Sequence, residues 1–359
     1  MPAAGPLNPS EEQDSPAPRR LPAEWEPHRS TVLCWPHQKD DWPGRFAPIP
    51  WVYTEIVKNL VPHELVRILV PSATAQARAQ RCLQRAGVGG DQVQFLRAET
   101  DRGWMRDTAP AFVKQAGRTL AVRFAFNGWA KYANWSRDRE VPGVLAQALG
   151  LEMSEANWNG QEVVLEGGAI DGNGCGTLLT TAECLLDRKI QPRNPSLSQA
   201  DYEAVFAAHL GIRRVIWLNQ GIAGDDTHGH IDDLCRFVGP DTVVLCRERQ
   251  ASDLNYRPLE ENFERLQDAR LADGARVQVV SLPLPRPLVF DGLRLPASYA
   301  NFYIANGAVL VPTFNDPNDR LALGILQELF PERRVIGIHA VDLVWGLGTI
   351  HCLSHEEPT

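Results

Sequence analysis

The sequence predicts a mixed α/β protein built from repeated modules of paired strands and single helices. Apolar, β-branched runs of strand length recur between Gly, Pro, Asn and Asp along the 359-residue chain. Stretches with apolar residues at helical spacing separate several of these runs. Strand pairs joined by turns therefore alternate with single helices, which differs from a doubly wound sheet of single βα units.

The individual elements follow from these patterns. Strands are expected at 31–36, 65–70, 92–97, 118–126, 162–168, 176–181, 213–218, 241–246, 277–285, 301–314 and 333–340. Helices, each with Gly or Pro near an end, are expected at 74–87, 198–211 and 318–330. Residues 1–20 are rich in Pro, Ala and acids and lack an apolar signal segment, so they are predicted to form a disordered leader. No long linker follows, and residues 21–359 are predicted to be a single domain.

Composition narrows the function. The formal net charge is −8 and no block of Lys or Arg is present, which argues against a nucleic-acid partner. No stretch approaches the roughly 20 apolar residues of a membrane span. The seven cysteines are odd in number and show no C-x-x-C spacing, so neither a disulfide framework nor a zinc ribbon is expected. These features predict a cytoplasmic protein with reduced thiols, whose acidic surface suits a cationic ligand and solubility equally.

Three stretches are dense in chemically capable residues, and each also has an ordinary structural interpretation. An Arg-Asp pair is usually a surface ion pair, and a Glu at a strand end is commonly solvated. "DGNGCG" resembles half of a calcium loop but is typical of a hairpin turn, and His-x-His without a nearby third ligand is weak evidence for a metal. The stretches are "GWMRDTAP" with Trp104, Arg106 and Asp107, "VVLEGGAIDGNG" with Glu166, and "GDDTHGHIDDLCRF" with His230 and Asp232.

The tail "GLGTIHCLSHEEPT" (346–359) favours a catalytic interpretation over these structural ones, because it places Cys352 beside a histidine near the end of the sequence. A cysteine, a histidine and several carboxylates beside turn-forming sequence form a set suited to nucleophilic catalysis. A cysteine protease needs only one polar group to orient its histidine, so the additional carboxylates indicate a cationic substrate. A guanidinium, with five N–H donors in a planar fork, matches such carboxylates and would lower the thiol pKa.

With these motifs in order, the sequence resembles the agmatine deiminases, within the agmatine and bacterial-type peptidylarginine deiminase group of the pentein superfamily. The resemblance implies a five-bladed α/β propeller of ββαβ-like modules with pseudo-fivefold symmetry, and a single pentein catalytic domain over residues 21–359. It rests on "LPAEWEPHRSTVLCWPH", "DDWPGRFAPIPWVYTEIV", "WMRDTAP", "FNGWAKY", "LEGGAIDGNGCGTLLTTAECLLDRKIQPRNP", "GDDTHGHIDDLCRF", "LPASYANFYIANGAVLVPTFNDPND" and "GTIHCLSHEEP".

The resemblance also implies the chemistry. It makes Cys352 the nucleophile, His230 the general acid and base with Glu166 as its partner, and Asp107 and Asp232 the clamp on the guanidinium. Trp104 is expected to contact the aliphatic chain of the substrate. The expected reaction converts agmatine to N-carbamoylputrescine and ammonia through a thiouronium on Cys352, in putrescine and polyamine metabolism. No metal or organic cofactor is expected, and a homo-oligomer is left open.

The chain departs from the family pattern around the far end of the substrate. Ala109 follows "RDT" where the family usually has Gly, and the tail reads "GLGTIHC" with "SHEE" rather than "GGGNIHC" with "TQQ" or "SQQ". His228 stands where an Asp is common, and Asp226 is the predicted partner of an ammonium tail. Arg106 and Arg236 are the basic residues nearest the motifs, yet acids adjoin both in sequence, so agmatine is expected over arginine.

Other interpretations remain at this point. Peptidyl or free arginine could be processed at the same site. An amidinotransferase would use the same cysteine and histidine, although no second amine site is evident. A cysteine hydrolase of amides would leave Asp107 and Asp232 without a role. A non-catalytic module that binds cations through its acidic loops is the alternative from another class.

Overall fold

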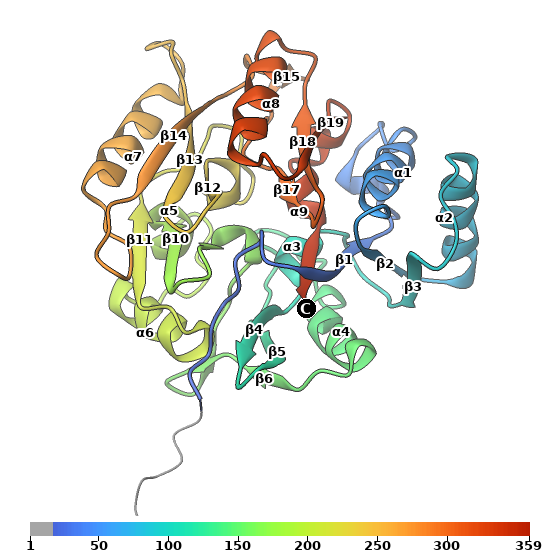
Figure 1. Cartoon of the computed structure of the whole chain (residues 1–359), viewed down its shortest axis with the longest axis horizontal. Helices are drawn as coiled ribbons and strands as arrows, with labels where there is room; N and C mark the ends of the chain where they lie inside the picture. Colours follow the sequence, from blue (N-terminus) through green and yellow to red (C-terminus); the bar gives the residue numbers. More distant parts are fainter. Residues whose placement is uncertain (1–16) are drawn as a thin grey trace, which may run out of the picture.

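The computed structural model describes residues 17–359 (Figure 1). Residues 1–16 of the predicted leader lie outside the described residues. Arg20, within the predicted leader, exchanges two backbone hydrogen bonds with Lys114. The boundary of the leader therefore stays a prediction.

The main sheets repeat one arrangement, in which an antiparallel strand pair is followed by a helix and a parallel strand. One sheet has four strands in the order β20-β1-β2-β3, with β1 (His28–Cys34), β2 (Leu65–Val70), β3 (Val93–Arg97) and β20 (His355–Pro358). Four sheets have three strands: β4 (Ala111–Gln115), β5 (Arg118–Arg123) and β6 (Met153–Glu155); β9 (Asp171–Gly172), β10 (Thr177–Thr181) and β11 (Arg214–Leu218); β12 (Cys235–Phe237), β13 (Thr242–Arg247) and β14 (Gln278–Pro283); β17 (Tyr303–Ile304), β18 (Ala308–Thr313) and β19 (Arg334–His339). Two hairpins add β7 (Asn157–Trp158) with β8 (Gln161–Glu162), and β15 (Val289–Phe290) with β16 (Leu293–Arg294).

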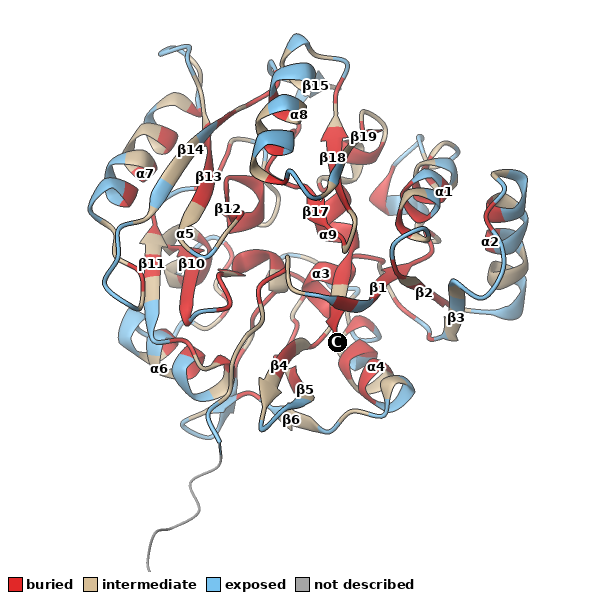
Figure 2. Ribbon diagram, in the orientation of Figure 1, coloured by how far each residue is buried: buried red, intermediate tan, exposed pale blue. Residues whose placement is uncertain are grey.

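Longer helices lie on the outside of the molecule, with exposed outer faces and buried inner faces (Figure 2). α6 illustrates why these segments are helical: Ser198 and Asp201 form a capping box at its start, and Gly211 ends it with φ 72°. These helices are α1 (Ile49–Leu60), α2 (Ala73–Arg85), α4 (Val141–Leu149), α6 (Gln199–Leu210), α7 (Tyr256–Asp268) and α8 (Pro317–Leu329). The short helix α5 (Ala182–Leu186) has no exposed residue.

Short helical segments lie at the centre, each directly before the first strand of a sheet. α3 contacts α9 and η3, and η3 contacts η4, so segments far apart in sequence meet there. These four segments are α3 (Met105–Thr108), η3 (Gly167–Ala169), η4 (Ile231–Asp233) and α9 (Ile350–Leu353). Three further single turns lie elsewhere, at η1 (Lys39–Asp41), η2 (Asp138–Glu140) and η5 (Leu343–Gly346).

The last strand of the chain completes the first sheet. β20 pairs antiparallel with β1, and Thr359 donates a backbone hydrogen bond to the carbonyl of Pro27 (Figure 1). Both strands are buried over most of their length, which fits a place between other elements. The segment that carries Cys352 is thereby held between α3 and this sheet.

Most predicted elements are confirmed within a few residues, but the strand expected at 162–168 is wrong. Pairing ends at Glu162, and a single bridge from Val164 to Ala125 follows before the turn of η3. The reason is that Glu166 bends inward to meet a buried arginine, which a continuous ladder would prevent. The hairpin predicted at "DGNGCG" is confirmed by the antiparallel pairing of β9 and β10.

All seven cysteines lie in the described part of the chain and are free thiols. Among residues 17–359, no helix combines the length and apolar character needed to cross a membrane.

Candidate active site

A pocket opens over the central segments, with an empty volume of about 360 Å³ that includes space open to solvent. Four of the predicted site residues line it, namely Trp104, Asp107, Asp226 and Cys352. The remaining three, Glu166, His230 and Asp232, are buried in the layer beneath. The full lining is Arg102, Trp104, Asp107, Trp129, Tyr132, Asp226, Thr227, Gly346, Leu347, Gly348 and Cys352.

Cys352 lies in α9 and is 7% exposed. Asn301 donates a hydrogen bond from Nδ2 to its Sγ at 3.1 Å, and Oδ2 of Asp232 lies 3.7 Å from the same sulfur. Burial raises the pKa of the Cys352 thiol well above its usual value, and the nearby carboxylates of Asp232, Asp233 and Asp107 raise it further. The thiol is therefore protonated until positive charge enters the pocket.

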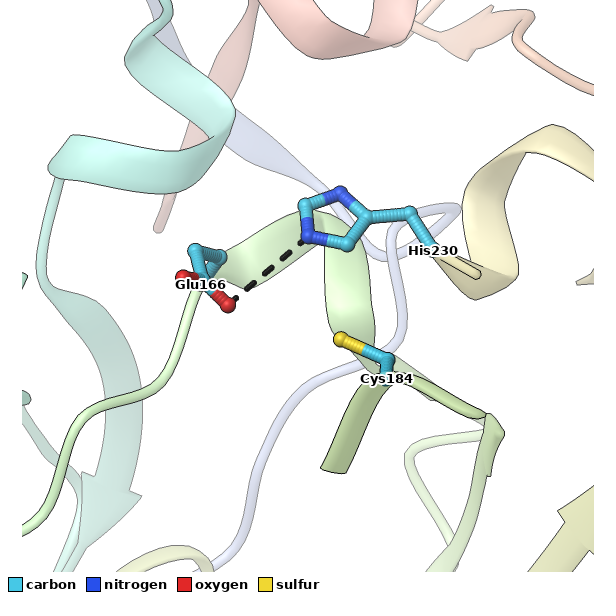
Figure 3. A group of neighbouring side chains, drawn as sticks. All are labelled: Glu166, Cys184 and His230. Atoms are coloured by element: carbon cyan, nitrogen blue, oxygen red, sulfur yellow. Dashed lines mark ion pairs between the residues drawn. The ribbon is translucent and has the colours of Figure 1, made fainter. Parts of the chain in front are cut away.

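His230 is surrounded by carboxylates. Its Nδ1 lies 3.8 Å from Asp107 and 3.9 Å from Asp232, and its Nε2 lies 3.7 Å from Glu166 (Figure 3). Burial acts to lower the pKa of His230, but Asp107, the thiol of Cys184 and Glu166 outweigh it and raise that pKa well above its usual value. At neutral pH the ring is consequently a cation that can donate a proton from Nδ1 toward the pocket.

Glu166 is held by a buried arginine that sequence reasoning did not single out. Arg193 donates from Nε to both carboxylate oxygens of Glu166, at 3.1 and 3.3 Å, and both side chains are fully buried. Burial alone would raise the pKa of Glu166, but Arg193 and His230 outweigh it and lower that pKa to about 2. Glu166 is thus a fixed negative charge behind His230.

Asp107 is fixed by two donors. Its Oδ1 accepts from the backbone N–H of Gly168 at 3.0 Å, and its Oδ2 accepts from Nε1 of Trp129 at 2.9 Å. Burial raises the pKa of Asp107 to about 6, although His230 acts in the opposite direction. A Cβ on Gly168 would lie 2.6 Å from Nδ1 of His230 and 2.8 Å from Oδ1 of Asp107, so only glycine fits between them.

Asp232 presents one engaged and one unengaged oxygen. Oδ2 accepts from Nδ1 of His351 at 2.7 Å and from Asn301 at 3.3 Å. Oδ1 has no hydrogen-bond partner within residues 17–359. Burial acts to raise the pKa of Asp232, but His351, His230 and Arg236 outweigh it and lower that pKa, so the group is a carboxylate at neutral pH.

The outer end of the pocket carries charges of both signs. Asp226, the predicted partner of an ammonium, is bound by Nζ of Lys131 and by the hydroxyl of Tyr132 at 2.6 Å. Arg102 also lines the pocket, stacks 4.0 Å over the Tyr132 ring and is paired with Asp41. A basic residue therefore lies in the pocket, where the sequence had indicated none.

The other basic candidates and His228 do not reach the pocket lining. Arg106 and Arg236 are both buried and share the carboxylate of Glu24. Nε2 of His228 lies 3.3 Å from Asp187, at a backbone position with φ 65°.

Two groups of metal-ligating residue types occur among the described residues. Glu166, Cys184 and His230 form one, shown in Figure 3, and Asp232, Asp233 and Cys352 form the other. The carboxylate of Glu166 is already held by Arg193, and that of Asp232 by His351. These donors argue against a cation in either group.

Sequence reasoning missed the residues that support the site. Their side chains meet it from segments distant in sequence, and all of them stand in the blocks that carried the resemblance, without a pattern of their own. They are Glu24, Trp129, Arg193, Asn301 and His351.

Comparison with known proteins identifies the family of this chain. It matches the family described as "Porphyromonas-type peptidyl-arginine deiminase" over residues 20–358. The chain belongs to this family. A family relative, the agmatine deiminase of Ectopseudomonas mendocina, is 34% identical over 94% of this chain and 95% of its own length.

Solved structures agree with the family assignment. The agmatine deiminase of Enterococcus faecalis aligns with a TM-score of 0.87 at 29% identity, covering 95% of this chain and 96% of that one. The agmatine deiminase of C. jejuni with substrate bound aligns with a TM-score of 0.84 at 29% identity, with the same coverage. The resemblance inferred from the motifs is confirmed, and the mixed α/β fold is that of these family structures.

Proposed function

We propose that this chain is a hydrolase that deiminates agmatine, releasing ammonia and N-carbamoylputrescine. The observation that carries the proposal is the placement of a thiol, two carboxylates and a protonated histidine around one buried pocket. The likeness to agmatine deiminases over nearly the whole chain supports it. The two carboxylates are assigned to Asp107 and Asp232, which lie at similar distances from Nδ1 of His230.

The chemistry begins when the guanidinium enters between these carboxylates. Its positive charge offsets the negative groups that hold the thiol of Cys352 protonated, so the thiol pKa falls, the thiol releases its proton to solvent, and the thiolate becomes available. Sγ attacks the guanidinium carbon, forming a C–S bond and a tetrahedral adduct. His230 donates its proton to one nitrogen, the C–N bond breaks, and ammonia leaves.

The second half of the reaction uses the same groups in reverse. The resulting S-alkylthiouronium is electrophilic, and neutral His230 now removes a proton from water as the oxygen attacks the same carbon. The C–S bond breaks, the hydroxyl proton of the adduct passes to the departing sulfur, and the thiol of Cys352 and the ureido product remain. Glu166 stays ionised throughout and stabilises the imidazolium each time it forms. The sequence of steps uses residues of this chain and needs no cofactor.

We further propose that the five similar sheets form the blades of an α/β propeller about the central segments, as one catalytic domain after the leader. The contacts among α3, η3, η4 and α9 support this arrangement, since each segment precedes a different sheet. We also retain the proposed cytoplasmic setting, which the free thiols support.

Trp104 and Asp226 are assigned to the remainder of the substrate. Trp104 is 5% exposed and offers an aromatic face to the aliphatic chain, while Asp226 lies at the outer end of the pocket to meet the ammonium. Free or peptidyl arginine is a second candidate, favoured by one observation, the position of Arg102 in the pocket lining. A guanidinium there could meet a carboxylate.

The test compares ammonia and ureido product from agmatine, free arginine, and peptides with internal or C-terminal arginine. We expect the highest kcat/KM with agmatine. Higher values for arginine or its peptides would overturn the substrate while leaving the reaction in place. Absence of ammonia with every substrate, from a protein with a cooperative thermal transition, would overturn the function itself.

A further inference from the structure

His351, the residue before Cys352, lies between two buried carboxylates. Its Nδ1 is 2.7 Å from Oδ2 of Asp232, and its Nε2 is 2.7 Å from Oε2 of Glu24. The side chain is 2% exposed. The mechanism above assigns no part to this ring, although it touches a residue of the guanidinium clamp.

The two oxygens that face the ring are acceptors. Oε2 of Glu24 also accepts from Arg106 and Arg236, and Oδ2 of Asp232 also accepts from Nδ2 of Asn301. Both ring nitrogens of His351 therefore lie where they donate hydrogen bonds to these oxygens.

Glu24 connects the His351 ring to a fixed group of charges. Its Oε2 also accepts from Nη2 of Arg106 at 3.1 Å and from Nη2 of Arg236 at 2.9 Å, while its Oε1 accepts from the backbone N–H of Ile304 at 2.8 Å. The orientation of Glu24 is therefore set by several donors. Nε2 of His351 is held by that carboxylate, and Nδ1 contacts Asp232 in the active site.

The bond from His351 fixes the orientation of the Asp232 carboxylate. Because His351 occupies Oδ2, the carboxylate is held with Oδ1 unengaged, 3.9 Å from Nδ1 of His230. An unengaged oxygen on an ionised carboxylate is the acceptor that a guanidinium N–H requires. Without the His351 bond, Asp232 could rotate or take up a proton, and the clamp would lose its charge.

We propose that His351 is a positioning residue for the guanidinium: its Nδ1 holds Oδ2 of Asp232, which leaves Oδ1 of the same carboxylate free to accept from the substrate. The proposal rests on the proposed function for its catalytic consequence, but the hydrogen bonds of the ring can be measured without substrate. In this proposal Cys352 attacks the substrate, and the adjacent His351 aligns Asp232 of the clamp.

The first experiment measures the ring directly. In wild-type protein labelled with ¹⁵N-histidine, both ring nitrogens of His351 are expected to give the signals of hydrogen-bond donors at the pH of the activity assay, with the signals assigned by their loss in His351→Asn. An Nδ1 of His351 that does not donate to Asp232 at this pH would overturn the proposal. An inactive wild-type enzyme would overturn the proposed function instead, and the spectrum would still decide the state of His351.

The second experiment uses two amide variants with opposite geometry. The amide of His351→Asn reaches the position of Nδ1 and can still donate to Asp232, whereas that of His351→Gln reaches the position of Nε2 and can donate only to Glu24. We expect kcat/KM to fall about tenfold in the Asn variant and a further tenfold or more in the Gln variant, with a raised KM for agmatine.

A matched control separates alignment from lost packing. His355 is also buried, and its Nε2 lies 2.9 Å from the backbone carbonyl of Pro110 rather than near the clamp. His355→Gln is expected to change the melting temperature as much as the His351 variants do and to leave KM unchanged. Equal kcat/KM in the Asn and Gln variants of His351, at equal melting temperature, would contradict the proposal.

Discussion

Gly168 is the sharpest place to perturb the site, because a side chain there would clash with both Asp107, of the proposed clamp, and His230, the proposed general acid. In Gly168→Ala the new Cβ would lie 2.6 Å from Nδ1 of His230 and 2.8 Å from Oδ1 of Asp107. Ordinary contact with a Cβ begins at about 3.4 Å, so the ring must retreat by roughly 0.8 Å and the carboxylate by roughly 0.6 Å. The backbone N–H that binds Asp107 remains.

A displacement of this size changes catalysis more than stability. Misplacing a catalytic group by about 1 Å costs on the order of 10²-fold, so we expect kcat/KM to fall by about that factor, chiefly in kcat. The assay is ammonia release from agmatine, with the melting temperature recorded in parallel. The overlap involves two side chains that can shift, so the fold should persist with a loss of about 1–3 kcal/mol.

The control is Gly143→Ala in α4, where a Cβ would meet nothing within 4 Å. This variant should be about 1 kcal/mol more stable, from helix propensity, and fully active. If Gly168→Ala kept kcat/KM within threefold of the wild type, Asp107 and His230 would not need their observed spacing, and the assigned clamp would be wrong.

Three further predictions concern charge. Cys352→Ser should abolish ureido product while leaving the melting temperature nearly unchanged, since an alkoxide forms far less readily than a thiolate; measurable product would contradict the nucleophile. Because Asp107 must be ionised and burial raises its pKa to about 6, kcat/KM should fall as pH drops below about 6. A bound guanidinium favours the ionised form of Asp107, so kcat should begin to fall at a lower pH than kcat/KM does. If kcat and kcat/KM fell at the same pH, this prediction would be refuted. Lys131→Met should lower KM for agmatine up to about fivefold, because Lys131, 42% exposed, competes for Asp226 in a pair worth about 0–1 kcal/mol; a raised KM would contradict the assignment of Asp226 to the ammonium.

The regular elements could largely be predicted from local sequence. The runs at 65–70 and 334–339 are strands whose apolar, β-branched residues pair in parallel with β1 and β18. The stretch at 162–168 has the same local character, yet the buried pairing of Glu166 with Arg193 ends the ladder. Local pattern cannot reveal a partner 27 residues away, and tertiary contact decided that segment.

The site residues, like the strands and helices, could be predicted from sequence only in part. Each residue proposed from the motifs lies in or directly beneath one pocket, because every motif sits just before the first strand of a sheet and those segments converge. The supporting partners were not foreseen. Asn301 meets Cys352 across 51 residues, and Lys131 meets Asp226 across 95, so neither contact leaves a periodic or spaced signal in sequence.

The pairing of β20 with β1 has a kinetic consequence. Ser30 and Glu357 share a hydrogen bond across 327 residues, so this contact closes one of the largest loops the chain can form. Such long-range contacts are slow to form because their loop entropy is lost before their energy is gained. α9, which carries the proposed nucleophile Cys352, adjoins this pairing, whereas the helices of the intervening modules need only local contacts. On refolding from denaturant, recovery of ammonia release should therefore lag behind recovery of the helical circular dichroism signal, and enzymatic activity becomes a late marker of the native topology.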